Sequence, residues 1–407
     1  MKLRFFLLLA ALMTGLGTAF SQSILPEKLT YQKTSTGKLV PYRDGVLVQS
    51  EGDYMFARFE ERKAAPLEVL GIEYWLDVEI GIGGALFLGA IEEDSGEIKV
   101  VMAKESPEAK PQPLSVPDEF HACFAGDHPS PIRPRLIRTN HEAAAMLEDV
   151  VWWLDKATWK HRKLPKIPKF HDEFLTDDPY QARWFLDGNT LYGGWDHGEW
   201  RGALASLDLG EADSAWVQLS GKTIKDDSGT PENHSVKSIV SPHPGELWVA
   251  VGSSHMGLAQ RGLYHREPGG KWQTLIHGVG DEDHGKLKPF FSAIDGLALD
   301  REGVPYLLAG STGIYRVKES ALDLLIAHDF QDQSFDQGDY TVSSTPSEIA
   351  VARNGDIFVS TNCLGVLAFR KTANQWSGRQ ITVDKQKDEK PDADSSPRQD
   401  ESPGEGK

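Results

Sequence analysis

The sequence predicts an all-β fold, because short apolar strands and tight turns recur along the chain without long helical patterns between them. Three stretches in the second half follow one template, beginning at Ser235, Ser292 and Thr345. Each contains an apolar strand, a polar turn, a second apolar strand, a loop of small residues and a third strand with an aromatic residue. A looser fourth copy begins at Gln181. The second half is therefore built from a repeated sheet unit.

Aromatic residues at matching positions give the period of this repeat. Tyr192, Trp248, Tyr306 and Phe358 are separated by 56, 58 and 52 residues, by subtraction of their numbers. Strand repeats of ~50 residues without helices between them are typical of four-stranded blades around a channel. In the turn Asn354-Gly355, glycine supplies the positive φ that a tight hairpin requires. These observations predict a single β-propeller.

The first half contains three more candidate blades in a less regular form. The segments that indicate them are GVLVQS with YMFARFE, GALFLGAI with KVVMAKES, and PRLIRTN with DVVWWLDKATWKHRKL. Counting these gives seven four-stranded blades, with six or eight as the open alternatives and a β-sandwich as the competing architecture. Because an open sheet edge invites aggregation, we expect the ring to close. The residues expected to close it are Arg379–Val383, paired in a blade that also includes residues near Leu29–Lys33.

The N-terminus has the pattern of a secretory signal peptide. Lys2 and Arg4 precede an apolar run, and Ala19 and Ser21 are spaced as a cleavage site requires. Cleavage after Ser21 is expected, with cleavage after Ala19 as the alternative. The apolar run is shorter than the roughly 20 residues that span a membrane. Residues 1–21 are therefore assigned to a signal peptide, and the mature chain is expected to be secreted or periplasmic without a membrane span.

Composition divides the remaining chain in two. Residues 22–383 are assigned to the propeller. Residues 384–407 contain no Val, Ile, Leu, Phe or Trp, so we expect a disordered acidic tail. The formal net charge of −17 argues against nucleic acid as a partner, since phosphate binding depends on Lys and Arg. The two cysteines, Cys123 and Cys363, are either buried thiols or a disulfide that closes a long loop.

One blade segment carries most of the candidate chemistry. Between Gly193 and Gly202 lie Trp195, Asp196, His197, Glu199 and Trp200. Glycine permits close approach of a ligand to the backbone, and tryptophan offers a flat surface for a sugar or another ring. Asp196 and Glu199 carry the oxygen ligands that calcium prefers, so a calcium ion is a candidate cofactor. The alternative is a structural loop whose carboxylates bind backbone amides.

The equivalent loops of two other blades extend this candidate site. His255 aligns with Glu199 when both are counted from the anchors of their blades, and the same loop of the final blade contributes Asn362. If the alignment holds, these residues face one end of the channel together. We therefore predict a ligand-binding face formed by Trp195, Asp196, His197, Glu199, Trp200, His255 and Asn362.

The last repeat resembles a known blade consensus. Pro346, Ile349-Ala350-Val351, Asn354-Gly355 and Ile357-Phe358-Val359 resemble NHL-type and gluconolactonase-like propellers. Leu297 to Val317 looks like the repeats of two-component-regulator propellers. Both resemblances imply the fold. Gluconolactonase-like enzymes also hold a metal with a carboxylate and Asn residues from separate blades. The corresponding positions here are Arg183, Ser238, Gly296 and Glu348, of which only Glu348 suits a hard cation.

Binding is the function that these features favour. The sequence shows no phosphate-binding loop, no dinucleotide fingerprint and no nucleophile elbow. We therefore predict a non-enzymatic propeller that binds a small molecule, a glycan or a protein at one face of its ring. A metal-dependent hydrolase or lactonase, or a carbohydrate-active enzyme using the channel rim, is the alternative.

Overall fold

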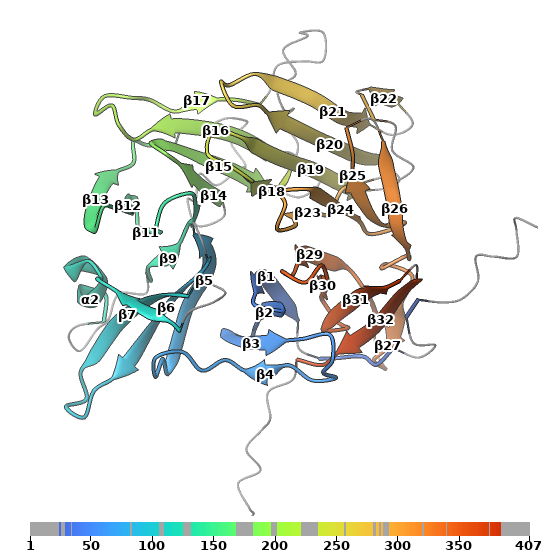
Figure 1. The fold of residues 1–407 in the computed structure, drawn as a ribbon, viewed down its shortest axis with the longest axis horizontal. Coiled ribbons are helices and arrows are strands. Elements are labelled where there is room, and N and C mark those ends of the chain that lie inside the picture. Colours follow the sequence, from blue (N-terminus) through green and yellow to red (C-terminus); the bar gives the residue numbers. More distant parts are fainter. Residues whose placement is uncertain are drawn as a thin grey trace, which may run out of the picture.

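Seven sheets stand around a central channel in the computed structural model (Figure 1). The described residues are 24–25, 29–33, 35–81, 84–105, 110–124, 132–167, 182–196, 202–220, 235–255, 258–279, 282–284, 286–287, 293–319, 321–338, 340–373 and 375–383. The predicted signal peptide and acidic tail lie outside these residues. Seven blades of mainly antiparallel strands, with one short helix among the described residues, confirm the predicted all-β propeller and its blade count.

Each blade is a consecutive run of strands, numbered here from the channel outward. Blade 1 contains β1 (Thr36–Tyr42), β2 (Gly45–Ser50), β3 (Asp53–Ala57) and β4 (Ala65–Pro66), and blade 2 contains β5 (Tyr74–Gly81), β6 (Gly84–Glu92), β7 (Ile98–Glu105) and β8 (Gln112–Leu114). After α2 (Asp118–Ala122), blade 3 contains β9 (Arg135–Leu136), β11 (Ala144–Leu147), β12 (Val150–Asp155) and β13 (Thr158–Lys163).

The second half continues the same order. Blade 4 contains β14 (Ala182–Asp187), β15 (Thr190–Asp196), β16 (Gly202–Asp208) and β17 (Val217–Gln218), and blade 5 contains β18 (Val236–Val240), β19 (Leu247–His255), β20 (Leu258–Arg266), β21 (Trp272–Val279) and β22 (Glu282–His284). Blade 6 contains β23 (Gly296–Leu299), β24 (Pro305–Ala309), β25 (Gly313–Val317) and β26 (Leu322–Ala327). The hairpin β27 (Ser334–Asp336) and β28 (Thr341–Ser343) leads to blade 7, with β29 (Pro346–Val351), β30 (Ile357–Thr361), β31 (Val366–Thr372) and β32 (Gln375–Ile381).

The hydrophobic core is divided into seven layers, one between each pair of neighbouring blades. The four aromatic anchors lie in the second strands of blades 4 to 7, and each packs into the layer between its own blade and the next one. Tyr192 and Phe358 are buried, while Trp248 and Tyr306 are partly buried. Burying such side chains stabilises the fold by roughly 1.5–3 kcal/mol each. The repeat is therefore the pattern that joins one blade to the next.

The end of the outermost strand of blade 7 is joined to blade 1 and to the segment that precedes it. Gln32 is buried, and its side chain donates to Leu364 O (2.8 Å) and accepts from the Val383 N–H (2.9 Å). Thr382 pairs with Lys63 of blade 1 through an isolated parallel bridge. The predicted contact between the C-terminal strand and the segment near Leu29–Lys33 is thus made by side chains and single bonds, rather than by an added strand.

Blades 3 and 4 share an inner segment. β9 pairs with β11 of blade 3, whereas β10 (Arg138–Thr139), two residues further on, pairs in parallel with β14 of blade 4. The hydroxyl of Thr139 and the N–H of Asn140 both donate to Leu186 O, each at 3.0 Å. The strand that begins as the inner edge of blade 3 therefore ends as part of blade 4.

The cysteines do not form the disulfide that the sequence left open. Cys123 follows α2 beside blades 2 and 3, Cys363 lies in blade 7, and both are buried free thiols. Burial raises the pKa of each thiol. The ring is closed by hydrogen bonds and packing, without a covalent link between these residues.

Candidate functional site

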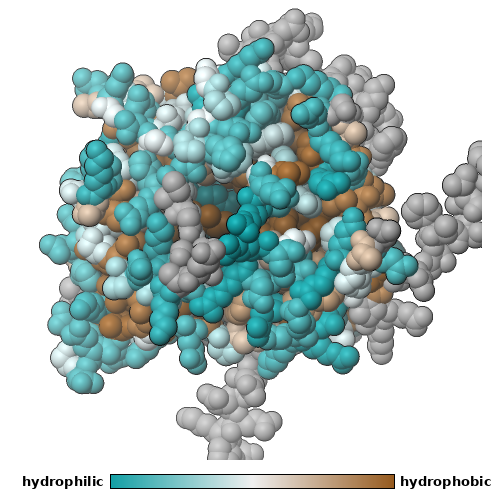
Figure 2. Space-filling model, viewed as in Figure 1, coloured by the Kyte–Doolittle hydropathy of each residue, from teal (hydrophilic) through white to brown (hydrophobic). Residues whose placement is uncertain are grey.

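The central channel holds two cavities, one toward each end of the ring. We call the end with the turns between first and second strands the turn face, and the opposite end the loop face. The turn-face cavity measures about 510 Å³ and the loop-face cavity about 350 Å³. Leu39, Arg138, Leu297 and Ile349 line both cavities and form the constriction between them. Figure 2 shows the ring hollowed at its centre, with hydrophobic residues inside the hollow.

On the loop-face side of the constriction, charged side chains from three blades bind one another. Lys38 Nζ lies 2.9 Å from both Asp77 Oδ1 and Glu79 Oε2, and Arg138 Nε lies 3.0 Å from Glu79 Oε1. Burial alone would raise the pKa of Glu79, but Lys38 and Arg138 lower it to about 2. Burial would lower the pKa of Lys38, whereas its two carboxylate partners raise it above its usual value. These charges stabilise one another in the ionised form.

A second ion pair crosses the channel. Arg183 Nη1 of blade 4 lies 2.9 Å from Glu348 Oε1 of blade 7, three blades away around the ring. The other oxygen of Glu348 accepts the N–H of Leu39 at 2.9 Å. Both oxygens of Glu348, which the sequence singled out as a residue that suits a hard cation, are therefore engaged by protein donors.

We define the charged belt as Lys38, Asp77, Glu79, Arg138, Arg183 and Glu348, whose ion pairs hold blades together. Asp77 accepts bonds from Tyr54 and Lys38 through Oδ1 and from the Leu136 N–H through Oδ2, which links blades 1, 2 and 3. Within the described part of the chain, no group of three or more His, Cys, Asp or Glu residues is placed to hold a metal ion. The sequence placed Arg183 and Glu348 at the starts of strands. It did not indicate that they form an ion pair, because 165 residues separate them in the chain.

The turn-face cavity has a different chemistry. Its walls are largely apolar, and the residues that form them are Leu39, Pro41, Ile80, Phe185, Val240, Leu297, Ala298, Leu299, Ile349 and Val351. Its rim carries Arg43, His243, Arg301 and Arg353. Arg43 is held by Glu105 through Nε at 2.8 Å. In the region that the structure describes, the side chains of Arg301 and His243 are exposed and make no hydrogen bond or ion pair.

Contacts between neighbouring turns hold this rim in place. Gly303 has a φ of +81°, and a Cβ added there would lie 2.7 Å from Pro242 Cβ, so the turns of blades 5 and 6 touch. Asn140 Nδ2 donates to Asp187 and to Ser241, at 3.1 Å each. Ring pockets whose edges are fixed before binding lose little ordering entropy when a ligand enters.

The structure separates the residues that the sequence predicted for binding. Trp195, 2% exposed, packs against Trp184 and Trp216 in the layer between blades 3 and 4. Its ring is therefore not available for stacking on a ligand, and this expectation is corrected: the residue lies within β15 rather than in a loop. Asp196 ends β15, and its Oδ2 lies 2.7 Å from Lys237 Nζ of blade 5.

The remaining members of the predicted site are at the loop face or outside the described residues. Asn362 follows β30, where its side chain accepts from the Thr345 N–H (2.7 Å) and donates to Ser343 O (3.0 Å), so the amide fixes a blade connection. His255 ends β19 opposite Leu258, and its side chain is not described. His197, Glu199 and Trp200 lie outside the described residues.

The sequence matches no protein-family model and no curated protein. Solved structures similar to it include the extracellular domain of a hybrid two-component system from B. thetaiotaomicron, 11% identical with a TM-score of 0.42, covering 86% of this chain and 41% of that chain. The WD40 β-propeller domain of Doa1 is 10% identical with a TM-score of 0.38, covering 85% and 96%. A gluconolactonase from Xanthomonas campestris is 8% identical with a TM-score of 0.35, covering 83% and 97%.

These structures are β-propeller proteins, as the repeat resemblance predicted. The chain spans about two fifths of the length of the first of them, and none of these likenesses carries an argument about activity. The fold stands on the seven sheets themselves, and function has to be argued from the channel.

Proposed function

We propose that this protein is a non-enzymatic binding propeller whose ligand enters the channel from the turn face. The observation that carries the proposal is the 510 Å³ cavity with apolar walls and a fixed polar rim. This volume lies within the range of ligand pockets, and predominantly apolar walls with few polar groups are typical of them. The charges of the belt are paired with one another, which favours binding over acid–base or metal-assisted hydrolysis at the other end.

A neutral apolar dye tests the cavity as a binding site. Nile red should fluoresce on entering it, and Leu299→Trp should reduce that signal severalfold, because Leu299 is a partly exposed residue of the cavity wall. Leu324→Trp is the matched control, since Leu324 is an exposed leucine on outer strand β26. Equal dye binding by both variants and the wild type would place the dye elsewhere and reject the proposed function.

We keep Glu199 and His255 as a second candidate location for ligand binding, at the loop face. The motivation is the composition of the segment after Asp196, together with the position of His255 at the end of its strand. Glu199→Ala should then leave the melting temperature nearly unchanged and weaken binding of calcium, measured by calorimetry against the wild type. Unchanged calcium binding in the variant removes Glu199 as a cation ligand, and undetectable calcium binding in both proteins removes Asp196 as well.

We also propose that the chain is exported, as its first 21 residues suggest. None of the described helices is long and apolar enough to cross a membrane. Mass spectrometry of the protein from the periplasm or medium should find a mature N-terminus at Gln22 or Phe20. An intact Met1 on cell-associated protein would reject export through this segment.

A further inference from the structure

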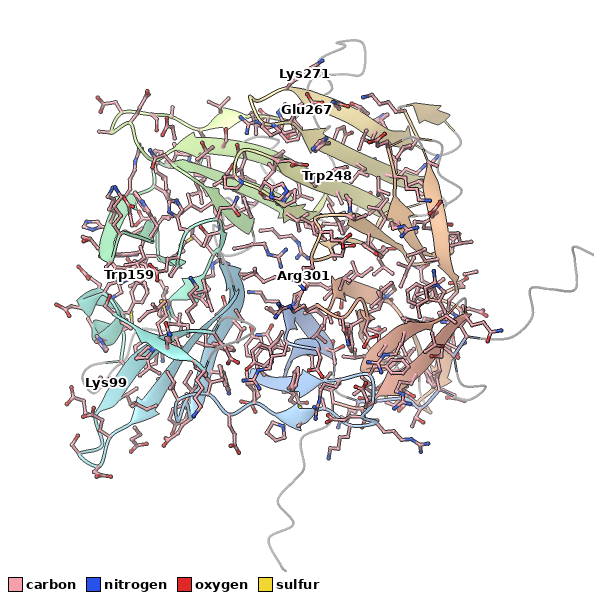
Figure 3. All side chains as sticks on the ribbon, viewed as in Figure 1. Lys99, Trp159, Trp248, Glu267, Lys271 and Arg301 are labelled. Carbon is pink, nitrogen blue, oxygen red and sulfur yellow. The ribbon has the colours of Figure 1, made fainter. Side chains whose placement is uncertain are left out.

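We propose that the turn-face cavity selects an apolar anion, such as a carboxylate on an alkyl or aromatic body, with Arg301 binding the anionic group at the rim. This inference rests on the proposed function, because it assigns a ligand class to the same cavity. Figure 3 shows Arg301 near the centre of the ring, on the turn between β23 and β24. Two features support this proposal: the geometry of the turn that carries Arg301, and the availability of its guanidinium group.

The other charges at the rim are already used. Asp300, the acidic residue that lines the cavity, accepts the N–H groups of Glu302 and Val304 at 2.9 Å each. Arg43 binds Glu105, Arg138 binds Glu79, and Arg353 is also engaged within the described residues. Arg301 is left as an exposed cation without a partner among the described residues. The charged side chains that line the cavity are four arginines and one aspartate, so its lining carries positive charge on a protein whose formal net charge is −17.

The position of Arg301 suits a ligand with two different ends. Its turn lies against the turn of blade 5 at Gly303 and Pro242, and Arg301 and His243 both line the turn-face cavity. Below both lie the apolar residues Leu297, Leu299 and Val240. A planar guanidinium binds a carboxylate through two parallel hydrogen bonds, and the apolar walls would cover the remainder of the ligand.

The experiment uses two ligands that differ only in their end group, octanoate and octan-1-ol, as competitors of Nile red on the full chain. Octanoate should displace the dye at about fivefold lower concentration than octan-1-ol, the size of effect expected for one partly exposed ion pair. Arg301→Gln should remove this preference while leaving displacement by octan-1-ol unchanged. Lys271→Gln removes an equal charge at the outer margin of the ring and should preserve the preference (Figure 3).

The outcomes separate the two proposals. If Nile red binds and both competitors displace it equally from the wild type, the cavity is a binding site but the selection of anions is rejected. If Arg301→Gln and Lys271→Gln reduce the octanoate preference equally, general electrostatics explains it and the role of Arg301 is rejected. If Nile red binding does not respond to Leu299→Trp, the proposed function itself has failed.

Discussion

Glu79 shows how one side chain can serve two neighbours in a buried setting. Its two oxygens bind Lys38 of blade 1 and Arg138 of the segment shared by blades 3 and 4, and it also accepts the N–H of Ile80 at 3.0 Å. Ion pairs at this depth contribute little net free energy relative to apolar side chains, but they become costly when one partner is removed. The belt therefore fixes the positions of inner strands more than it adds to overall stability.

Glu79→Gln should lower the free energy of unfolding by about 3 kcal/mol at neutral pH, because two buried cations lose their shared carboxylate. The folded-state pKa of Glu79, about 2, lies below the unfolded value of about 4.3. The ionised carboxylate therefore stabilises the fold fully at pH values above the unfolded pKa. This contribution is lost as pH falls from about 5 to about 2.

Urea denaturation of both proteins across pH 2–6 measures the effect. The wild type should lose more stability on acidification than the variant does in that window. Glu93→Gln, which disrupts an exposed pair with Lys99 at 3.6 Å, is the control and should change stability by less than about 0.5 kcal/mol. Parallel pH profiles for the wild type and Glu79→Gln would contradict the assignment.

The hairpin turns are the elements that set the rim of the cavity. Each begins where an inner strand leaves the channel, and several require a left-handed backbone at glycine. Gly303 and Gly355 have φ values of +81° and +87° on the turns of blades 6 and 7. They differ in surroundings, because Gly303 faces Pro242 whereas a Cβ on Gly355 would meet nothing within 4 Å.

This difference makes the two glycines a matched pair. Gly355→Ala should lower the free energy of unfolding by about 1 kcal/mol through backbone strain alone. Gly303→Ala should cost more and should also weaken octanoate binding, since its new methyl group pushes the turn of Arg301 away from Pro242. Thermal denaturation and the dye displacement assay measure both. Equal stability losses with unchanged affinity would show that contact between the turns is unimportant.

The whole ring depends on the seam between blades 7 and 1. Phe59 lies beneath the guanidinium groups of both Arg370 and Arg379, at 4.5 and 4.8 Å from its ring centre. Arg370 also binds Asp356 of its own blade and Glu60 of blade 1. Because the two blades meet through residues more than 300 positions apart, forming their contacts carries a large loop-closure entropy.

Gln32→Ala should weaken this seam by about 1–2 kcal/mol, because it leaves the Val383 N–H without its buried acceptor and removes one of the two amide donors to Leu364 O. Melting temperature measures the loss. Gln337→Ala, at an exposed glutamine whose amide donates to Asp336 O, should change it little. If the two variants melt at the same temperature, the bonds of Gln32 do not contribute to closure.

The ring could be predicted from the sequence more fully than its channel. Anchors such as Phe358 and turns such as Asn354-Gly355 are local patterns, and the structure confirms the blades that they indicated. The belt escaped detection because its members stand singly on separate strands and meet only across the ring. Trp195 was misassigned because burial between blades depends on the neighbouring Trp216, which sequence spacing alone does not place.

The strand shared between blades 3 and 4 has a consequence for how the ring opens. A propeller of independent blades could lose one sheet at a time, as repeat proteins lose single repeats. Here β9 and β10 follow one another directly, so displacing β10 from β14 of blade 4 also strains the pairing of β9 with β11 of blade 3. The amides of Ile137 and Asn140, which donate to Ala144 O and Leu186 O, should therefore exchange with deuterium at a common rate. Seven sheets would then behave as six cooperative units, with the largest spanning blades 3 and 4.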